Sequence, residues 1–246
     1  MRTAPGATTA LPPGAVTPRM PRNRKEAPMS HPISSAVPAA PAANGTAAPS
    51  LTCGIVAGPL FLAVWLAQAL TRDGYDLTRH PLSLLSLGDL GWIQIANFVL
   101  CGSLFLALSA GLRRRLETGR GHRWAPILVG FHGVGLIVAG VFPTDPGAGF
   151  PEGAPAGAPV MSWHGMVHEF GFLIAQVAWF SAAVVFARRF SALGEKAWAR
   201  LCAAAPVAVL LVLAVPHMDS LSPRIVLATA IEFALLTALA RHHARR

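Results

Sequence analysis

Two histidines four residues apart form the most chemically suggestive pattern in this 246-residue sequence. The segment "SWHGMVHEFG", residues 162–171, contains His164 and His168, with Glu169 directly after the second histidine. On a helix, residues four apart lie on one face with side chains about 6 Å apart, which suits two ligands of one metal ion, and zinc is the candidate ion. The glutamate lies outside the pair, so the pattern is not HExxH. Packing and hydrogen bonding at a helix end are the commoner origin of such a pair, and both interpretations stay open.

A metal centre built on this pair needs a third ligand, which other polar residues offer. The candidates are Asp145, His217, Asp219 and His80, with Ser83 as a further polar residue on the same side. The first three of these are also the candidate catalytic residues, because a metal with an open position acidifies a bound water for attack on an ester or amide. The segment "PTDPG" around Asp145 is equally typical of a turn, in which proline fixes φ and aspartate binds its own backbone. Turn formation therefore explains Asp145 as well as catalysis does.

Three ionisable residues lie inside long apolar runs. His132 is near the middle of one run, Glu232 is midway along another, and Glu169 is about two turns inside a third. An ionisable group at the centre of a bilayer costs roughly 2.5–3.5 kcal/mol on insertion scales, so each should face other helices and find a partner. At 1.5 Å per residue, His132 and Glu232 reach similar depths of about 13–15 Å. We expect them to form a buried pair, which is either structural or part of a proton or substrate path, and we favour the structural role.

The elements that position these residues are predicted by the apolar runs. Hydrophobic residues make up 53% of the chain and charged residues only 13%, whereas soluble domains carry about 25% charged residues. Six runs of roughly 18–25 residues follow residue 50, each long enough for a helix to cross roughly 30 Å of hydrocarbon. They cover residues 51–70, 93–112, 124–142, 163–187, 198–216 and 223–240. The sequence therefore predicts an all-α membrane protein, a six-transmembrane helix bundle, with the lipid bilayer as its partner.

The two ends of the chain differ from the predicted transmembrane domain, residues 51–240. Residues 1–50 are rich in Pro, Ala, Gly, Ser and Thr and almost lack large apolar side chains, which predicts a disordered N-terminal tail. Residues 241–246 form a basic C-terminus. Both ends are expected in the cytoplasm.

Arginine and lysine residues between the runs predict the orientation. Five lie after the second run, three after the fourth and three at the C-terminus, against three in the first, third and fifth loops together. The positive-inside rule then places both termini in the cytoplasm and the first, third and fifth loops outside. The expected location is the cell (plasma) membrane, crossed several times. Membrane topology explains the basic clusters, so we expect no nucleic-acid partner.

Four segments resemble the successive signatures of a bacterial family, domain-of-unknown-function family 998. They are "HPLSLLSLGDLGWIQIANFVLCG", "GVGLIVAGVFPTDP", "SWHGMVHEFG" and "LSPRIVLA". "GVFPTDP" followed by "HGMVH" is the specific part, and the resemblance covers roughly residues 51–240. The family's last-helix motif usually has Gln before Arg-Ile, whereas Pro223 precedes Arg224 here. The resemblance implies an integral membrane protein of six helices with no established activity.

Two function classes therefore remain open. The first is a non-enzymatic membrane protein, such as a sensor or small transporter, and we favour it. The alternative is a membrane-embedded, metal-dependent hydrolase that acts on a lipid or amide at the outer leaflet, with zinc held by His164 and His168. The sequence contains no nucleotide-binding loop, haem motif or serine-nucleophile elbow, which argues against an ATP-driven pump within this chain.

Overall fold

The computed structural model describes residue 14, residues 47–214 and residues 220–246. The described residues from 47 onward form one compact unit, which contains every described helix. The elements are α1 Ala47–Thr71, the short 3-10 helix η2 Leu82–Ser86, α2 Gly91–Arg115, α3 Trp124–Val141, α4 Trp163–Ala192, α5 Lys196–Leu213 and α6 Leu221–Ala244. The described residues contain no β-strand, so the all-α prediction is confirmed for them. Most of the predicted tail, residues 1–50, lies outside the described residues, and its last four residues form the start of α1.

Six of these helices are long and apolar enough to cross a membrane, which confirms the predicted six-helix bundle. Their ends run past the predicted ends wherever arginines follow the apolar run. Helix α2 continues to Arg115, and α4 continues through Arg188 and Arg189 to Ala192. Backbone hydrogen bonding does not need apolar side chains, so a helix continues into the polar interface after its lipid-contacting stretch has ended.

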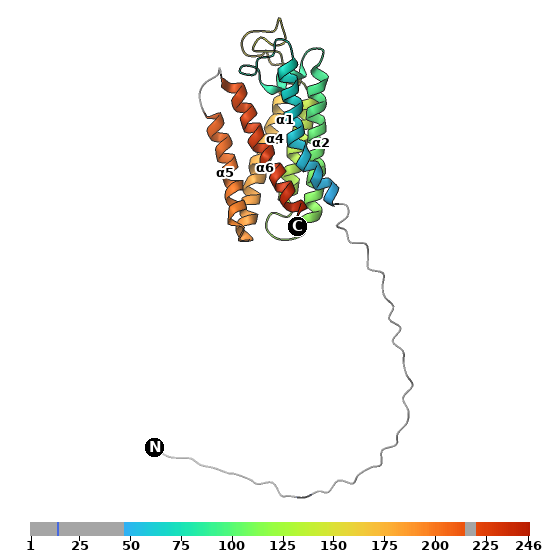
Figure 1. The fold of residues 1–246 in the computed structure, drawn as a ribbon, viewed down its shortest axis with the longest axis vertical. Helices are drawn as coiled ribbons and strands as arrows, with labels where there is room; N and C mark the ends of the chain where they lie inside the picture. The colour runs from blue at the N-terminus through green and yellow to red at the C-terminus, as the bar shows by residue number, and fades with distance from the viewer. Residues whose placement is uncertain (1–13, 15–46, 215–219) are drawn as a thin grey trace, which may run out of the picture. The chain divides into compact units, whose positions relative to one another are not determined.

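The helices pack in chain order and close into a ring. Each transmembrane helix packs against its neighbours in the sequence, and α6 returns to pack against α1. In Figure 1 the first turn of α1 and the C-terminus lie at the same end of the bundle. We call this the basic end, which also holds residues 116–123 and 193–195. The loop end lies opposite and holds residues 72–90 and 142–162, including η2.

Helices α3 and α4 approach each other closely through glycine. A Cβ atom on Gly135 would lie 2.5 Å from the carbonyl oxygen of Gly171 and 2.6 Å from the backbone nitrogen of Ala175. A Cβ atom on Gly171 would lie 2.9 Å from the backbone nitrogen of Ala139. Small residues permit this kind of backbone contact in membrane helices, where packing replaces the hydrophobic effect as the main attraction. The contact brings the side chains of each helix within reach of the other helix's carbonyl groups.

The basic end is tied together by arginine side chains. Arg189 Nη1 donates to the carbonyl oxygens of Thr118 at 2.9 Å and Arg120 at 3.0 Å, which fastens the α2–α3 connection to α4. Both terminal nitrogens of the Arg246 guanidinium donate hydrogen bonds to the Glu195 carboxylate, at 2.8 and 2.7 Å. This forked pair fastens the C-terminus to the turn between α4 and α5.

The loop end is held by His80. Its Nδ1 accepts the Asp76 backbone N–H at 2.9 Å, and its Nε2 lies 3.1 Å from the carbonyl oxygen of Ala148. Its own carbonyl oxygen accepts the Tyr75 hydroxyl at 2.7 Å and the Ser222 hydroxyl at 2.6 Å. The α1–η2 connection, the α3–α4 connection and the start of α6 therefore meet at one buried residue, His80, through its ring and its backbone carbonyl group.

Candidate functional site: a polar cavity between α3, α4 and α6

A cavity of about 560 Å³ lies between α3, α4 and α6, next to the connections of the loop end. This volume falls in the range of roughly 300–1,000 Å³ that is usual for small-molecule sites. Most of the wall is apolar. Its polar residues are Ser83, Thr144, Asp145, His132, His168, Glu169, Gln176, Thr229 and Glu232, with Arg79 at the loop end. The predicted candidates Ser83 and Glu169 therefore both line this cavity.

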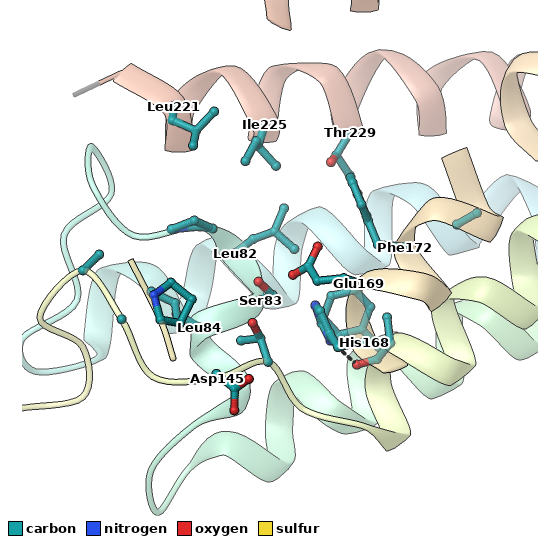
Figure 2. A pocket seen from close by; sticks show the side chains of 18 of the residues that line it. Leu82, Ser83, Leu84, Asp145, His168, Glu169, Phe172, Leu221, Ile225 and Thr229 are labelled. Carbon is teal, nitrogen blue, oxygen red and sulfur yellow. Dashed lines mark hydrogen bonds between the residues drawn. The ribbon is translucent and has the colours of Figure 1, made fainter. Parts of the chain in front are cut away.

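Two helices face each other across the cavity without filling it. Figure 2 shows Glu169 and Phe172 of α4 directed toward Ile225 and Thr229 of α6. Lining residues recur every four positions on both helices, so each helix presents one stripe to the cavity. The stripe on α4 is His168, Phe172 and Gln176, and the stripe on α6 is Leu221, Ile225, Thr229 and Phe233.

The imidazole of His168 caps two carbonyl groups at the C-terminal end of α3 that have no helical donor. In a helix, a carbonyl accepts the N–H four residues later, and Pro143 has no N–H to offer Ala139, while Phe142 lies one residue beyond α3 in extended backbone. His168 Nδ1 lies 2.8 Å from the Ala139 oxygen and 3.0 Å from the Phe142 oxygen. Carbonyl oxygens only accept, so the partners assign the proton to Nδ1 and leave Nε2 of the neutral ring as an acceptor.

The carboxylate of Asp145 fastens the start of α4. Its Oδ2 accepts the Ser162 backbone N–H at 2.7 Å, and the Ser162 hydroxyl oxygen accepts the Gly165 N–H at 3.1 Å as the helix N-cap. A Cβ atom on Gly165 would collide with this carboxylate, so glycine is required there. Burial alone would raise the pKa of the Asp145 carboxyl, but the Ser162 hydrogen bonds and the neighbouring His164 outweigh it and hold the pKa below its usual range.

His164 makes the same kind of backbone contact as His168, at a more exposed position. Its Nδ1 lies 3.1 Å from the carbonyl oxygen of Pro143. Its Nε2 lies 3.8 Å from Asp145 Oδ1, an ion-pair distance when the ring is protonated. The spacing of four residues thus places both histidines of the pair on one face of α4, where they contact carbonyl groups at the end of α3 and in the two residues after it.

His132 mirrors His168 across the contact between α3 and α4. Its Nδ1 lies 3.1 Å from the carbonyl oxygen of Ala175 on α4, while His168 of α4 contacts Ala139 of α3. The proton is again assigned to Nδ1, which leaves Nε2 as an acceptor. The side chain is 1% exposed and lines the cavity, and Nε2 has no hydrogen-bond partner among the described residues.

Glu232 takes a different partner from the one predicted. The residue is 2% exposed, and its Oε2 accepts a hydrogen bond from Gln176 Nε2 at 3.3 Å. Within the described residues no hydrogen bond or ion pair joins it to His132, so the predicted direct pair is wrong, although both residues line the same cavity. The physical reason is the close approach of α3 and α4, which turns the His132 ring toward the Ala175 carbonyl group.

The structure assembles only part of the predicted metal site. Across residues 47–214 and 220–246, no three His, Cys, Asp or Glu side chains lie close enough together to hold a metal ion. His164 and His168 each keep Nε2 available, and Asp145 lies beside His164. His80 is excluded as a third ligand, because both of its ring nitrogens are used by the backbone. The remaining candidates lie outside the described residues: His217 and Asp219.

Sequence reasoning missed the uncharged polar residues of the cavity. Gln176 is the hydrogen-bond partner of Glu232, and Thr229 and Thr144 line the wall. Their spacing from the predicted site residues could have revealed Gln176 and Thr229. Gln176 lies eight residues after His168, and Thr229 lies three residues before Glu232, so each shares a helix face with a predicted site residue.

The fold and the cavity together define a class of protein: an all-α, six-helix membrane protein with a polar cavity between its helices. The family described as "Protein of unknown function (DUF998)" matches residues 55–242, and this chain belongs to it. The family resemblance of "GVFPTDP" and "HGMVH" is therefore confirmed. A search among curated proteins found no match, and neither did a search among solved structures. The family description assigns no activity, so the function must be argued from the cavity.

We predict that replacing His168 by Ala destabilises the protein by about 1–3 kcal/mol, the usual cost of leaving buried polar groups without a partner. The carbonyl groups of Ala139 and Phe142 would lose their donor, and Pro143 offers Ala139 no substitute. The measurement is reversible unfolding in mixed micelles, or the apparent Tm in detergent.

His122→Ala is the matched control for this substitution. His122 Nδ1 also contacts a carbonyl oxygen, that of Gly119 at 2.8 Å, but this residue is only half-buried and the hydrogen bond is exposed, so water can replace it. Equal losses of stability in the two variants would contradict the capping role of His168.

Proposed function

We propose that this chain is a non-enzymatic membrane protein, a sensor or small transporter, that binds an amphipathic small molecule in the cavity between α3, α4 and α6. The observation that carries the proposal is the Nε2 atom of His132. It is buried in the wall of a ligand-sized cavity without a hydrogen-bond partner among the described residues.

An unpartnered buried acceptor is costly, which is why it points to a ligand. More than 90% of buried polar groups in proteins are hydrogen-bonded, and each one that is not costs about 1–3 kcal/mol. A bound molecule with a donor group would remove that cost at His132. Ionisable residues within membrane helices are by default candidates for substrate or ion pathways, and Glu232 lies in the same wall.

The wall favours an amphipathic ligand over a purely polar one. Apolar side chains form most of it, and a few polar groups converge at one side, the usual pattern of small-molecule sites. Exposed residues also belong to it, namely Arg79 and Ala158 at the loop end and Glu169 on α4. A ligand therefore has a route to the cavity from the loop end or from between α4 and α6.

Filling the cavity should abolish binding. Thr229 lines the cavity and points into it (Figure 2), so Thr229→Trp would occupy its space. We expect at least one member of a panel of twelve-carbon amphiphiles (alcohol, carboxylate, sulfate and primary amine) to bind the wild type with one-to-one stoichiometry. Binding to Thr229→Trp should be at least tenfold weaker. Native mass spectrometry in a non-ionic detergent measures both.

Leu227→Trp is the matched control, because Leu227 lies two residues away on α6, is 51% exposed and does not line the cavity. This variant should bind like the wild type. Failure of every panel member to bind the wild type, or unchanged binding to Thr229→Trp, would contradict the proposed function.

The metal-dependent hydrolase is the second candidate, and the geometry of the histidine pair supports it. Metal-ligating histidines usually donate their second ring N–H to a carbonyl or carboxylate, which fixes the ring. His164 and His168 both place Nδ1 against carbonyl oxygens and keep Nε2 for a ligand. A zinc ion would then need a third ligand, such as Asp145. The Asp145 carboxylate would have to move so that it and both imidazole rings reach the same ion.

Metal content distinguishes the two candidates. The hydrolase requires about one zinc ion per chain after purification without chelators, and loss of that ion in the double variant His164→Ala, His168→Ala. The measurement is elemental mass spectrometry on folded, monodisperse protein. The non-enzymatic proposal predicts substoichiometric zinc in both samples, and stoichiometric zinc that disappears in the double variant would overturn it.

We further propose that the loop end faces the outside of the cell and that both termini are cytoplasmic. The basic end carries the arginine clusters at the C-terminal ends of α2 and α4, as the positive-inside rule requires of the cytoplasmic side. The cavity would then receive its ligand from outside or from the outer leaflet.

Thiol labelling of intact cells tests this orientation. Single cysteines replace Asp73 at the loop end and Glu117 at the basic end, both exposed, in a background without the three native cysteines. A membrane-impermeant maleimide should label Asp73→Cys and leave Glu117→Cys unlabelled until the cells are opened. The reverse pattern would place the loop end in the cytoplasm.

A further inference from the structure

We infer that the ligand of this cavity is an amphiphile with a protonated amine headgroup, which lies against Glu232 and the Nε2 atom of His132 while its hydrocarbon part occupies the apolar wall. This inference rests on the proposed function and deepens it. It follows from the chemistry of the groups that line the cavity.

When Glu232 is ionised, its carboxylate and the Nε2 atoms of the two imidazoles offer only hydrogen-bond acceptors to the cavity. Carbonyl contacts assign the Nδ1 protons of His132 and His168, so both Nε2 atoms are acceptors in the neutral rings. Gln176 donates to Glu232, which leaves the other carboxylate oxygen and the Gln176 amide oxygen as acceptors. A ligand that binds here has to supply the hydrogen-bond donors.

The carboxylate of Glu232 also lacks a positive partner. Among the described residues no Lys, Arg or His side chain makes an ion pair with it, although it is 2% exposed. A carboxylate buried away from water costs several kcal/mol unless a cation or a set of donors compensates it, so without a cation such a side chain keeps its proton. Arg79, the basic residue in the wall, is exposed at the loop end. A positively charged group of the ligand would supply the ion-pair partner that Glu232 lacks.

Aromatic rings in the wall add to the preference for a cation. Phe61, Phe98 and Phe233 all line the cavity, with ring centroids 5.2 Å apart for Phe61–Phe98 and for Phe61–Phe233. The faces of aromatic rings attract ammonium groups. Carboxylate, imidazole lone pair and aromatic rings together form a site for an organic cation, and the acceptors favour one with N–H groups over a quaternary ammonium.

The size and polarity of the cavity define the rest of the ligand. Its volume of about 560 Å³ and its mainly apolar wall suit a single hydrocarbon chain. A free alkylamine and a single-chain lipid with an ethanolamine headgroup share this chemistry. Both carry a primary ammonium at neutral pH, because alkylamines have pKa values near the 10.4 of lysine.

The test compares four probes that share a twelve-carbon chain: dodecylamine, dodecyltrimethylammonium, dodecanol and dodecyl sulfate. Affinities for the full chain are measured by native mass spectrometry at pH 7 in a non-ionic detergent. We expect dodecylamine to bind at least tenfold more tightly than each of the other three. Glu232→Gln should reduce that preference to threefold or less, because it keeps the shape of the side chain and removes its charge. Glu117→Gln, an exposed carboxylate at the basic end, is the matched control and should leave the preference unchanged.

The outcomes separate this inference from the proposed function. Binding of all four probes with similar affinity, abolished by Thr229→Trp, would overturn the amine inference and leave the cavity a ligand site. Absence of binding by every probe would overturn both. If Glu232→Gln does not fold, the probe ranking on the wild type decides alone, and a rank order led by any probe other than dodecylamine contradicts the inference. Displacement of dodecylamine by lysophosphatidylethanolamine would assign the ligand to the membrane, and resistance to it would assign a free amine.

Discussion

The structure depends on two carbonyl groups where α3 ends that have no helical donor. Pro143 removes the N–H group that would have reached Ala139, Phe142 lies just beyond the helix, and His168 of α4 supplies the donor to both carbonyl oxygens. In a membrane no water compensates such a loss, so the contact fixes how α4 lies on α3. Gly135 makes the contact possible, because only a glycine there lets the two backbones come close enough.

This constraint explains why the family's signature segments belong together. The turn after α3 supplies the prolines and Asp145, and the start of α4 supplies the N-cap Ser162, the glycine against the Asp145 carboxylate, and the two histidines. These residues interlock one helix end with the next helix start. The arrangement fixes the end of α3 against the start of α4. It also leaves the Nε2 atom of His168 in the wall of the adjoining cavity.

The cavity is the part of the fold that structural needs do not explain. Helices α4 and α6 could close on each other with larger side chains, yet the wall keeps Glu232 and His132 buried and Gln176 half-buried around open space. Proteins tolerate such groups in membrane helices where a ligand, ion or proton uses them. Binding of an amphiphile accounts for both properties of the wall, its apolar area and its set of acceptors.

The sequence predicted the spans well and their side-chain contacts poorly, for physical reasons. A run of apolar residues reveals that a helix crosses the bilayer, but Arg188 and Arg189 show that the helix itself continues beyond that run. The spacing of His164 and His168 predicted a shared face without saying what that face meets. Depth along the helix suggested a pair of His132 and Glu232. Contacts also depend on the rotation of each helix about its axis, and this rotation places Glu232 within hydrogen-bond distance of Gln176 instead.

The most direct test of the central claim is whether the cavity admits polar reagents within the membrane span. In nanodiscs, with both faces accessible, a small charged thiosulfonate reagent is added to Thr229→Cys and to Leu227→Cys in the cysteine-free background. Thiols react as thiolates, which form in water and not in hydrocarbon. The account predicts rapid modification at position 229, which lines the cavity, and slow modification at position 227, which is exposed outside it. Equal, slow modification at both positions would contradict the existence of an open polar cavity.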